Sequence, residues 1–332
     1  MAVVYVKDQG AIIRKHGERI LVEKDDALLM EIRLRETQSV AVFGNVQVTT
    51  QALSELLDRG IPLALYTRHG RLKGHLVPDI SKNVPLRVAQ YRMALDDSAS
   101  LAIAKAVVRA KLWNAGKLLA DYRGHYPSDA LAAACEAMRS TAECLAVAAD
   151  HSTLLGHEGS AAATYFRVFA EMNRSELPFD GRRKHPATDP INGLLSLGYT
   201  LVMNEIRAVA EGVGLEPHLG FLHRVDYGRP SLALDLLEPF RSPLVDRLTL
   251  RLVNERMLTV VDFGKRAAGA AAGGVVLLPD AFRKYLEAYE AAVSEPRERA
   301  PSGLRNAWRA DVEKLLAAIR DGVPFTPYCE AD

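Results

Sequence analysis

The chain has 332 residues, a length greater than one hydrophobic core usually organises, and 48% of them are hydrophobic. We therefore expect two domains. Its 42 Lys and Arg balance 41 Asp and Glu to a formal net charge of +1, which excludes a uniformly basic protein and requires any nucleic-acid surface to be local. Three cysteines without CxxC or Cys/His spacing exclude a zinc motif and a disulfide framework. With no signal peptide or uninterrupted apolar span, we expect a cytoplasmic protein with no membrane association.

Residues 1–80 have the composition of a small β-rich domain. Segments rich in β-branched residues, with partial alternation, occur at 3–6, 11–23, 27–34, 39–49 and 61–67. Between the last two, TQALSELLDRG (50–60) has a Thr cap, apolar residues at helical spacing and a terminating glycine. We therefore predict one helix packed on a small sheet.

A different pattern follows residues 81–85, which we predict to be a linker. From 86 to 332, long Ala/Leu-rich segments repeat apolar residues at intervals of three and four, as in 88–122. The small-residue stretch AAGAAAGG (267–274) predicts a flexible loop. Turn-forming residues predict the main breaks at 125–127, 176–190, 211–220 and 228–231. The predicted fold class is α+β, with a small N-terminal β-rich domain followed by a larger all-helical domain.

Glu158 lies in the segment LLGHEGSAAATYFRVF (154–169). The two glycines beside it predict turns, so we expect Glu158 at a helix start, where the helix dipole favours a carboxylate. On this feature alone, a helix cap explains Glu158 better than a catalytic role does.

The segment 214–241 carries a second group of polar residues. His223 precedes a Gly-Arg-Pro turn, and on the helix that follows Asp235 and Glu238 are three positions apart and share a face. Leucines surround both acids, and two acids so placed repel each other unless a cation compensates them.

Two carboxylates and one imidazole suit Mn²⁺ or Mg²⁺, which can activate an oxygen nucleophile and stabilise charge at a phosphorus centre. The alternative is structural: His223 caps a helix, and Asp235 or Glu238 pairs with Arg229 or Arg241. Spacing alone leaves both interpretations open.

Three long segments resemble the signature segments of one known family. They are GHEGSAAATYF, DPINGLLSLGYTLV (189–202) and GLEPHLGFLHRVDYGRPSLALDLLEPFRSPLVDRL (214–248). They are similar to the CRISPR-associated integrase, also called the CRISPR-associated endonuclease, which inserts new spacers into a CRISPR array. The β-rich and helical organisation resembles that family as well, so the likeness covers nearly the whole chain.

The resemblance implies a catalytic metal site. Glu158, His223 and Glu238 would be the catalytic residues and the ligands of Mg²⁺ or Mn²⁺, and Asp235 would lie close to the metal or support a ligand. The implied reaction is a metal-dependent transesterification, in which the 3′-hydroxyl of a protospacer duplex attacks a phosphodiester at the edge of a CRISPR repeat. The implied partners are that DNA, a small ferredoxin-like adaptation protein, and a second copy of the chain bound through the N-terminal domain.

Other residues are candidates for DNA contacts. Arg182, Arg183 and Lys184 form a basic run that can hold phosphates, with a solvated loop as the alternative. Tyr165 and Tyr199 lie in the resembling segments, where a hydroxyl can contact DNA, and core packing is the alternative for both.

Two other functions share parts of this pattern. A structure-specific metal-dependent nuclease of DNA repair would use the same ligands but need neither a repeat nor a partner. A non-catalytic helical DNA-binding scaffold would use the acids only as caps and ion pairs.

Overall fold

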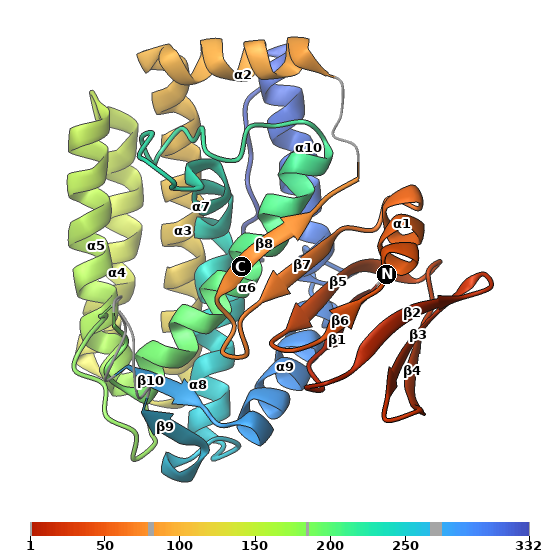
Figure 1. The fold of residues 1–332 in the computed structure, drawn as a ribbon. Coiled ribbons are helices and arrows are strands. Elements are labelled where there is room, and N and C mark those ends of the chain that lie inside the picture. Colours follow the sequence, from red (N-terminus) through yellow and green to blue (C-terminus); the bar gives the residue numbers. More distant parts are fainter. Residues whose placement is uncertain (1, 79–82, 184–185, 266–273, 332) are drawn as a thin grey trace. The chain divides into compact units, whose positions relative to one another are not determined.

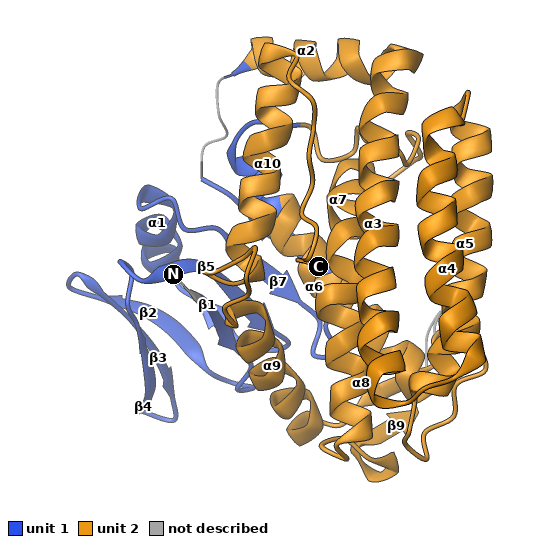
Figure 2. Cartoon of the chain, turned by 180° about the vertical axis from the view of Figure 1, so that it is seen from behind, with its two compact units in different colours: residues 1–83, 208–215 blue, residues 84–207, 216–332 orange. Residues whose placement is uncertain are grey.

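The computed structural model describes residues 2–78, 83–183, 186–265 and 274–331 (Figure 1). The chain divides into two compact units (Figure 2). Residues 1–83 with 208–215 form the first unit, and residues 84–207 with 216–332 form the second. Lys184 and all but the last residue of the predicted loop at 267–274 lie outside the described residues. Of the predicted linker at 81–85, residues 81 and 82 lie outside them, and Val84 and Pro85 begin a helix.

The first unit contains two four-stranded sheets. In one sheet, parallel strands β1 (Ala2–Val6), β5 (Thr37–Phe43) and β7 (Leu63–Tyr66) are joined by antiparallel β8 (Leu72–Leu76). The other sheet has the order β4 (Ala27–Ile32), β3 (Arg19–Lys24), β2 (Ile12–His16), β6 (Gln47–Val48). The prediction of one small sheet was therefore wrong. Strand β8, LKGHL, was missed because Lys, Gly and His weaken a β pattern.

Helix α1 (Thr50–Asp58) of this unit forms as predicted. Its cap is Thr49, whose side chain accepts a hydrogen bond from the backbone N–H of Ala52 at 3.3 Å. The apolar face of the helix buries Ala52 and Leu56 in the same core as Ile13, Ile20 and Leu63 from the strands. Burial of these side chains is what holds the sheets and the helix together.

The second unit is mostly helical. Its helices are α2 (Val84–Leu95), α3 (Asp97–His125), α4 (Asp129–Cys144), α5 (His151–Met172), α6 (Pro190–Gly212), of which residues 208–212 belong to the first unit, α7 (Ser231–Leu237), α8 (Arg247–Asn254), α9 (Pro279–Ser294) and α10 (Leu304–Asp321). Shorter helical turns are η1 (Leu145–Val147), η2 (Glu238–Phe240), η3 (Arg241–Asp246) and η4 (Val260–Asp262). The α+β fold class is confirmed.

The second unit is nevertheless not all-helical, contrary to the prediction. Strands β9 (Phe263–Lys265) and β10 (Val275–Leu277) form an antiparallel hairpin. Each strand has only three residues, which is too short for an alternating pattern to distinguish it from the surrounding helices.

Helix α3 is the scaffold of the second unit and lies beside α4 and α5 (Figure 1). The predicted helical stretch 88–122 breaks at Asp96, whose side chain accepts a hydrogen bond from the Ala99 N–H at 2.9 Å and so caps α3. Leu118 and Leu119 are fully buried on this helix. None of the helices in the described parts of the chain is long and apolar enough to cross a membrane.

Candidate active site

Glu158 lies inside α5, not at its start. The helix begins at His151, and its cap is Asp150, which accepts a hydrogen bond from the Thr153 N–H at 2.7 Å. The prediction of a helix start at Glu158 was therefore wrong. The two neighbouring glycines are exposed, and burial of Leu154 and Ala161 on either side keeps the helix continuous through them despite their low helix propensity. The carboxylate is two turns into the helix, where packing and neighbouring charges set its surroundings and the helix dipole contributes little.

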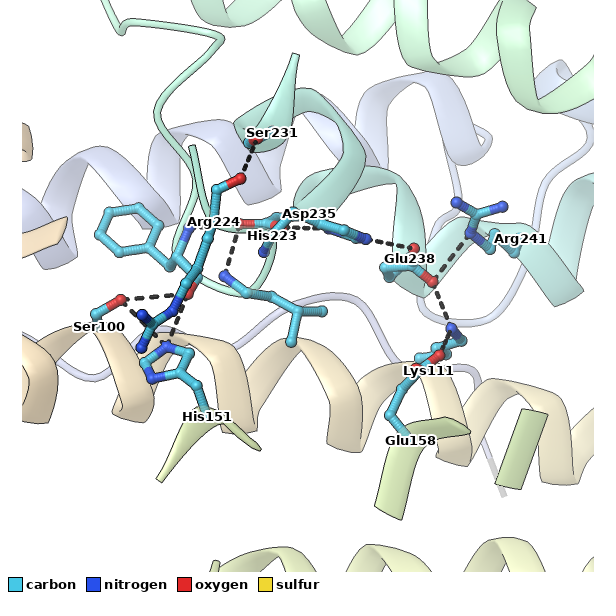
Figure 3. A network of polar contacts seen from close by, with 12 residues as sticks. Ser100, Lys111, His151, Glu158, His223, Arg224, Ser231, Asp235, Glu238 and Arg241 are labelled. Carbon is cyan, nitrogen blue, oxygen red and sulfur yellow. Dashed lines mark hydrogen bonds and ion pairs between the residues drawn. The ribbon is translucent and has the colours of Figure 1, made fainter. Parts of the chain in front are cut away.

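His223 lies on a loop that the Asp235 carboxylate organises. That carboxylate accepts hydrogen bonds from the backbone N–H groups of Phe221 at 2.6 Å, Leu222 at 2.9 Å and His223 at 2.9 Å. It also accepts one from Nδ1 of the His223 ring at 2.7 Å. With Nδ1 committed to Asp235, Nε2 of His223 points to the Glu238 carboxylate, 3.9 Å from Oε1 (Figure 3).

The opposite side of this loop is bound to α3 and α5. The Phe221 carbonyl accepts hydrogen bonds from Ser100 Oγ at 3.2 Å and from His151 Nε2 at 2.9 Å (Figure 3). Gly220 is required where the loop meets α7, because a Cβ there would lie 2.6 Å from Asp235 Oδ2. The loop that carries His223 is therefore fixed on both sides before any ligand binds.

Lys111 is at the centre of the site. It lies on α3, donates a hydrogen bond to Glu158 Oε1, and its Nζ lies 2.8 Å from Glu238 Oε2. Nε of Arg241 lies 2.9 Å from the same oxygen of Glu238. Glu238 is the first residue of η2, directly after α7, and is 3% exposed. Its carboxylate therefore has cations on one oxygen and faces His223 with the other.

The charges in this cluster compensate one another. Burial alone raises the pKa of the Glu238 carboxyl, whereas its positive neighbours lower it; in order of decreasing effect these are Arg241, Lys111 and His223, and they hold the pKa well below its usual range. Burial alone lowers the pKa of the Lys111 ammonium, but Glu238 and Glu158 more than offset this, so that pKa is raised. Lys111 and Glu238 are therefore both charged at neutral pH.

The cluster lines a pocket of about 1100 Å³ in the second unit. At the pocket wall, Tyr165 and Tyr199 donate their hydroxyls to the buried Asp246, with 2.7 Å between Tyr165 and Asp246. The Arg241 guanidinium lies over the Tyr199 ring, 4.4 Å from its centroid. Both tyrosines are buried with their hydroxyls paired, as core packing requires, and both also line the pocket, so a DNA contact by either stays a prediction.

The basic run divides into two environments. Arg182 lines the pocket and donates to the Asn192 side chain at 2.8 Å and to the Ser196 hydroxyl at 3.2 Å. Arg183 is exposed, which agrees with the alternative that this run is a solvated loop. Among the described members of the run, only Arg182 reaches the site.

The structure brings together Glu158, His223 and Glu238, and it places Asp235 behind His223, where its carboxylate binds Nδ1 of the ring and the backbone of the loop. Of the two acids, Glu238 pairs with Arg241, as the structural alternative allowed. Sequence analysis missed Lys111. The signal was available, since Lys111 is followed by buried Leu112 and lies on the same stripe of α3 as buried residues one turn away.

The donor set suits a divalent cation. Within the described ranges, no three His, Cys, Asp or Glu side chains form a ready metal-binding group. The reason is visible in Figure 3: the Lys111 ammonium lies between the Glu158 and Glu238 carboxylates. Two carboxylates and an imidazole are donors that Mg²⁺ and Mn²⁺ accept, and here they already surround a positive charge. On donor chemistry, the residues present fit the metal.

Solved structures with the same architecture define the class to which this fold belongs. A CAS1 protein from Thermotoga maritima superposes with a TM-score of 0.81 and 23% sequence identity, covering 96% of this chain and 97% of that one. A casposase bound to integration product has a TM-score of 0.81 and 22% identity, with 98% and 93% covered. At these identities the likeness shows a shared Cas1-type fold.

Sequence relatives establish the family. The family model described as CRISPR associated protein Cas1 matches residues 4–291. The chain is 38% identical over 319 residues to CRISPR-associated endonuclease Cas1 2 of Rhodospirillum rubrum, covering 91% of this chain and 90% of that protein. It is 36% identical over 323 residues to CRISPR-associated endonuclease Cas1 3 of Thermus thermophilus, covering 96% and 92%. The chain belongs to the Cas1 family, and the resemblance found in the sequence is confirmed.

Proposed function

We propose that this protein is a divalent-metal-dependent DNA endonuclease and integrase that inserts new spacers into a CRISPR array. The observation that carries the proposal is the meeting of Glu158, Glu238 and His223, from three separate segments, at one wall of a pocket with arginines. Membership of the Cas1 family supports it, as does the likeness to a casposase bound to integration product.

In this proposal Glu158, His223 and Glu238 hold one Mg²⁺ or Mn²⁺ ion. A bound divalent ion supplies a Lewis acid that stabilises the charge developing on a phosphate oxygen. Asp235 acts behind His223: by accepting the Nδ1 proton it fixes the tautomer in which Nε2 offers a lone pair. His223 is thus a ligand and not a general base, and Asp235 is a positioning residue.

Arg241 is suited to bind the phosphate that reacts. Its Nε pairs with Glu238, its plane is fixed against Tyr199, and among the described residues nothing hydrogen-bonds to Nη1 or Nη2. Two free N–H edges of a guanidinium match the oxygens of a phosphodiester. The Arg182 guanidinium, 5.5 Å from the Tyr199 ring centroid, adds positive charge to the same pocket.

The proposed reaction is a balanced exchange of phosphodiester bonds. The 3′-oxygen of the incoming strand forms a bond to phosphorus, and the bond from phosphorus to the 3′-oxygen of the repeat strand breaks. The attacking hydroxyl releases its proton to solvent, and the leaving oxygen takes one up. Hydrolysis uses water in place of the incoming hydroxyl at the same phosphorus, which accounts for an endonuclease activity in the same site.

The proposed partners are DNA, a small ferredoxin-like adaptation protein and a second copy of this chain. Structures titled as Cas1–Cas2 complexes share the fold and support the small adaptation protein as a partner. The first unit supports the homodimer: β4 is an edge strand whose Leu28, Leu29 and Met30 are exposed. An exposed apolar edge strand is a surface that proteins normally cover.

The test is joining of a short labelled duplex into a supercoiled plasmid that carries a repeat. We expect joining only with Mg²⁺ or Mn²⁺ and with the adaptation protein, and its loss in His223→Ala and Glu238→Gln. Cleavage that is indifferent to repeat and partner would favour a repair nuclease. Joining that persists in both variants would overturn the assignment of the site.

A further inference from the structure

The feature that the proposed function does not use is Lys111. Its ammonium lies between the Glu158 and Glu238 carboxylates, and its side chain is 20% exposed (Figure 3). Lysine carries a compact charge on a flexible four-carbon stem, so its head can move while its backbone stays in the helix. The rest of α3 around it is rigid, with Leu112 and Ala115 buried.

The site is charge-balanced as it stands. Glu158 and Glu238 supply two negative charges, and Lys111 and Arg241 supply two positive charges in direct contact with them. Without a cation between them, two carboxylates so close would repel each other. Lys111 therefore holds both acids charged and in place when no metal is bound.

Lys111 and a divalent ion would use the same oxygens. Glu158 Oε1 and Glu238 Oε2 face the ammonium, and an ion that coordinates those oxygens would lie next to a positive charge in a partly buried site. Like charges at this separation repel strongly where water does not screen them. Arg241 cannot relieve this by moving, because it is stacked on Tyr199. Lys111 is the cation that can leave.

We infer that Lys111 is the resident counter-ion of the metal-free site, which a divalent cation displaces into the pocket, where the freed ammonium meets a DNA phosphate. This inference rests on the proposed function. Its consequence is that metal and DNA favour each other: metal releases Lys111 for the phosphate, and a phosphate that holds Lys111 leaves the carboxylates to the metal.

The experiment measures Mn²⁺ binding directly, by calorimetric titration of the whole chain without DNA. Lys111→Met removes the competing charge and keeps the apolar stem, so we expect Mn²⁺ to bind at least about tenfold more tightly than in wild type. In the same variant, joining activity falls despite the tighter binding, because the phosphate contact is lost. Lys105→Met is the matched control, since Lys105 lies on the same helix but donates to the Ala146 carbonyl.

A second measurement covers the case in which Lys111→Met does not fold. In wild type, the NMR signal of the Lys111 ε-methylene group, assigned by its absence in Lys111→Arg, shifts on addition of Mg²⁺ if the ammonium leaves the carboxylates. An unchanged signal at saturating Mg²⁺ would overturn the inference.

The outcomes separate this inference from the proposed function. If Lys111→Met binds Mn²⁺ no more tightly than wild type and Glu158→Gln does not bind it, the counter-ion role of Lys111 is overturned and the metal site stands. Mn²⁺ binding that is absent in wild type, or survives both Glu158→Gln and His223→Ala, overturns the metal site and the inference with it.

Discussion

Two buried clusters in the second unit have the same charge pattern: one cation between two glutamates. In the candidate active site Lys111 lies between Glu158 and Glu238, and its side chain is 20% exposed. In the other cluster Arg305 of α10 lies between Glu205 of α6 and Glu290 of α9. Arg305 is 4% exposed and donates twice to each carboxylate, at 2.6–3.3 Å.

The difference lies in whether the cation can be exchanged. Arg305 is planar, fully engaged and shut away from water, and Tyr289 adds a hydrogen bond to Glu205 at 2.9 Å. That cluster joins three helices and offers no open position. The Lys111 cluster lines a pocket, and its cation has a movable stem. We therefore expect the closed cluster to contribute to stability and the open cluster to contribute to activity.

The largest expected effect is on the closed cluster. Arg305→Ala removes the buried cation that binds the two partly buried carboxylates of Glu205 and Glu290, so we expect a loss of about 3–5 kcal/mol in the free energy of unfolding. Urea unfolding followed by circular dichroism measures it. Adding Glu205→Gln and Glu290→Gln should recover part of the loss, and a change below about 1 kcal/mol would show that this cluster is not the closed structural one.

The open cluster should respond in activity. His223→Ala is expected to reduce joining by about 10²–10³-fold, comparable to removing a group that stabilises the transition state. Unfolding should change little, since the His223 side chain is at the pocket wall. The rate of strand joining and the midpoint of urea unfolding, measured on the same preparation, test both expectations. A His223→Ala protein that loses stability but keeps the wild-type rate of joining would show that the open cluster is structural.

Asp235 should show an intermediate effect. Asp235→Asn keeps the size of the side chain but replaces one of its two acceptor oxygens with an NH₂ donor, so the side chain can no longer accept hydrogen bonds both from the loop backbone and from the His223 ring. We therefore expect a loss of about 10–100-fold in Mn²⁺ affinity and joining. Asp226→Asn, an exposed acid on the same connection, is the control and should leave both unchanged. An Asp235→Asn protein with wild-type Mn²⁺ affinity would remove Asp235 from its positioning role.

The smallest effect concerns pH. Burial raises the pKa of Asp246, and the hydroxyls of Tyr199 and Tyr165 offset only part of this. The folded state thus holds the proton more tightly than the unfolded state, whose pKa is about 3.9, so stability falls as pH rises between the two values. Asp246→Asn should flatten this fall in a Tm profile from about pH 4 to 7, each unit of pKa difference being about 1.4 kcal/mol. Parallel profiles for the variant and wild type would contradict the raised pKa.

The sequence predicted the α+β fold and most helix breaks, because hydrophobic periodicity and turn residues are local signals, whereas the three candidate ligands came from the resemblance of long segments to a known family. It did not predict the helical position of Glu158, since two flanking glycines indicate a turn unless packing is known. It also missed Lys111, which lies 47 positions from Glu158 and becomes its partner only when α3 and α5 pack together. The buried stripe of α3 indicates that Lys111 faces the core, but no spacing pattern in the chain indicates which acids it meets there.

The separation of the site residues along the chain also bears on protein synthesis. A nascent chain that has emerged only through α5 (His151–Met172) carries Lys111 and Glu158 but neither His223 nor Glu238. The loop with His223 acquires its shape only after Asp235, which follows it, has been made. Under the proposed function, fragments that end before α7 lack Asp235 and Glu238, and we expect them to show neither joining nor cleavage of DNA.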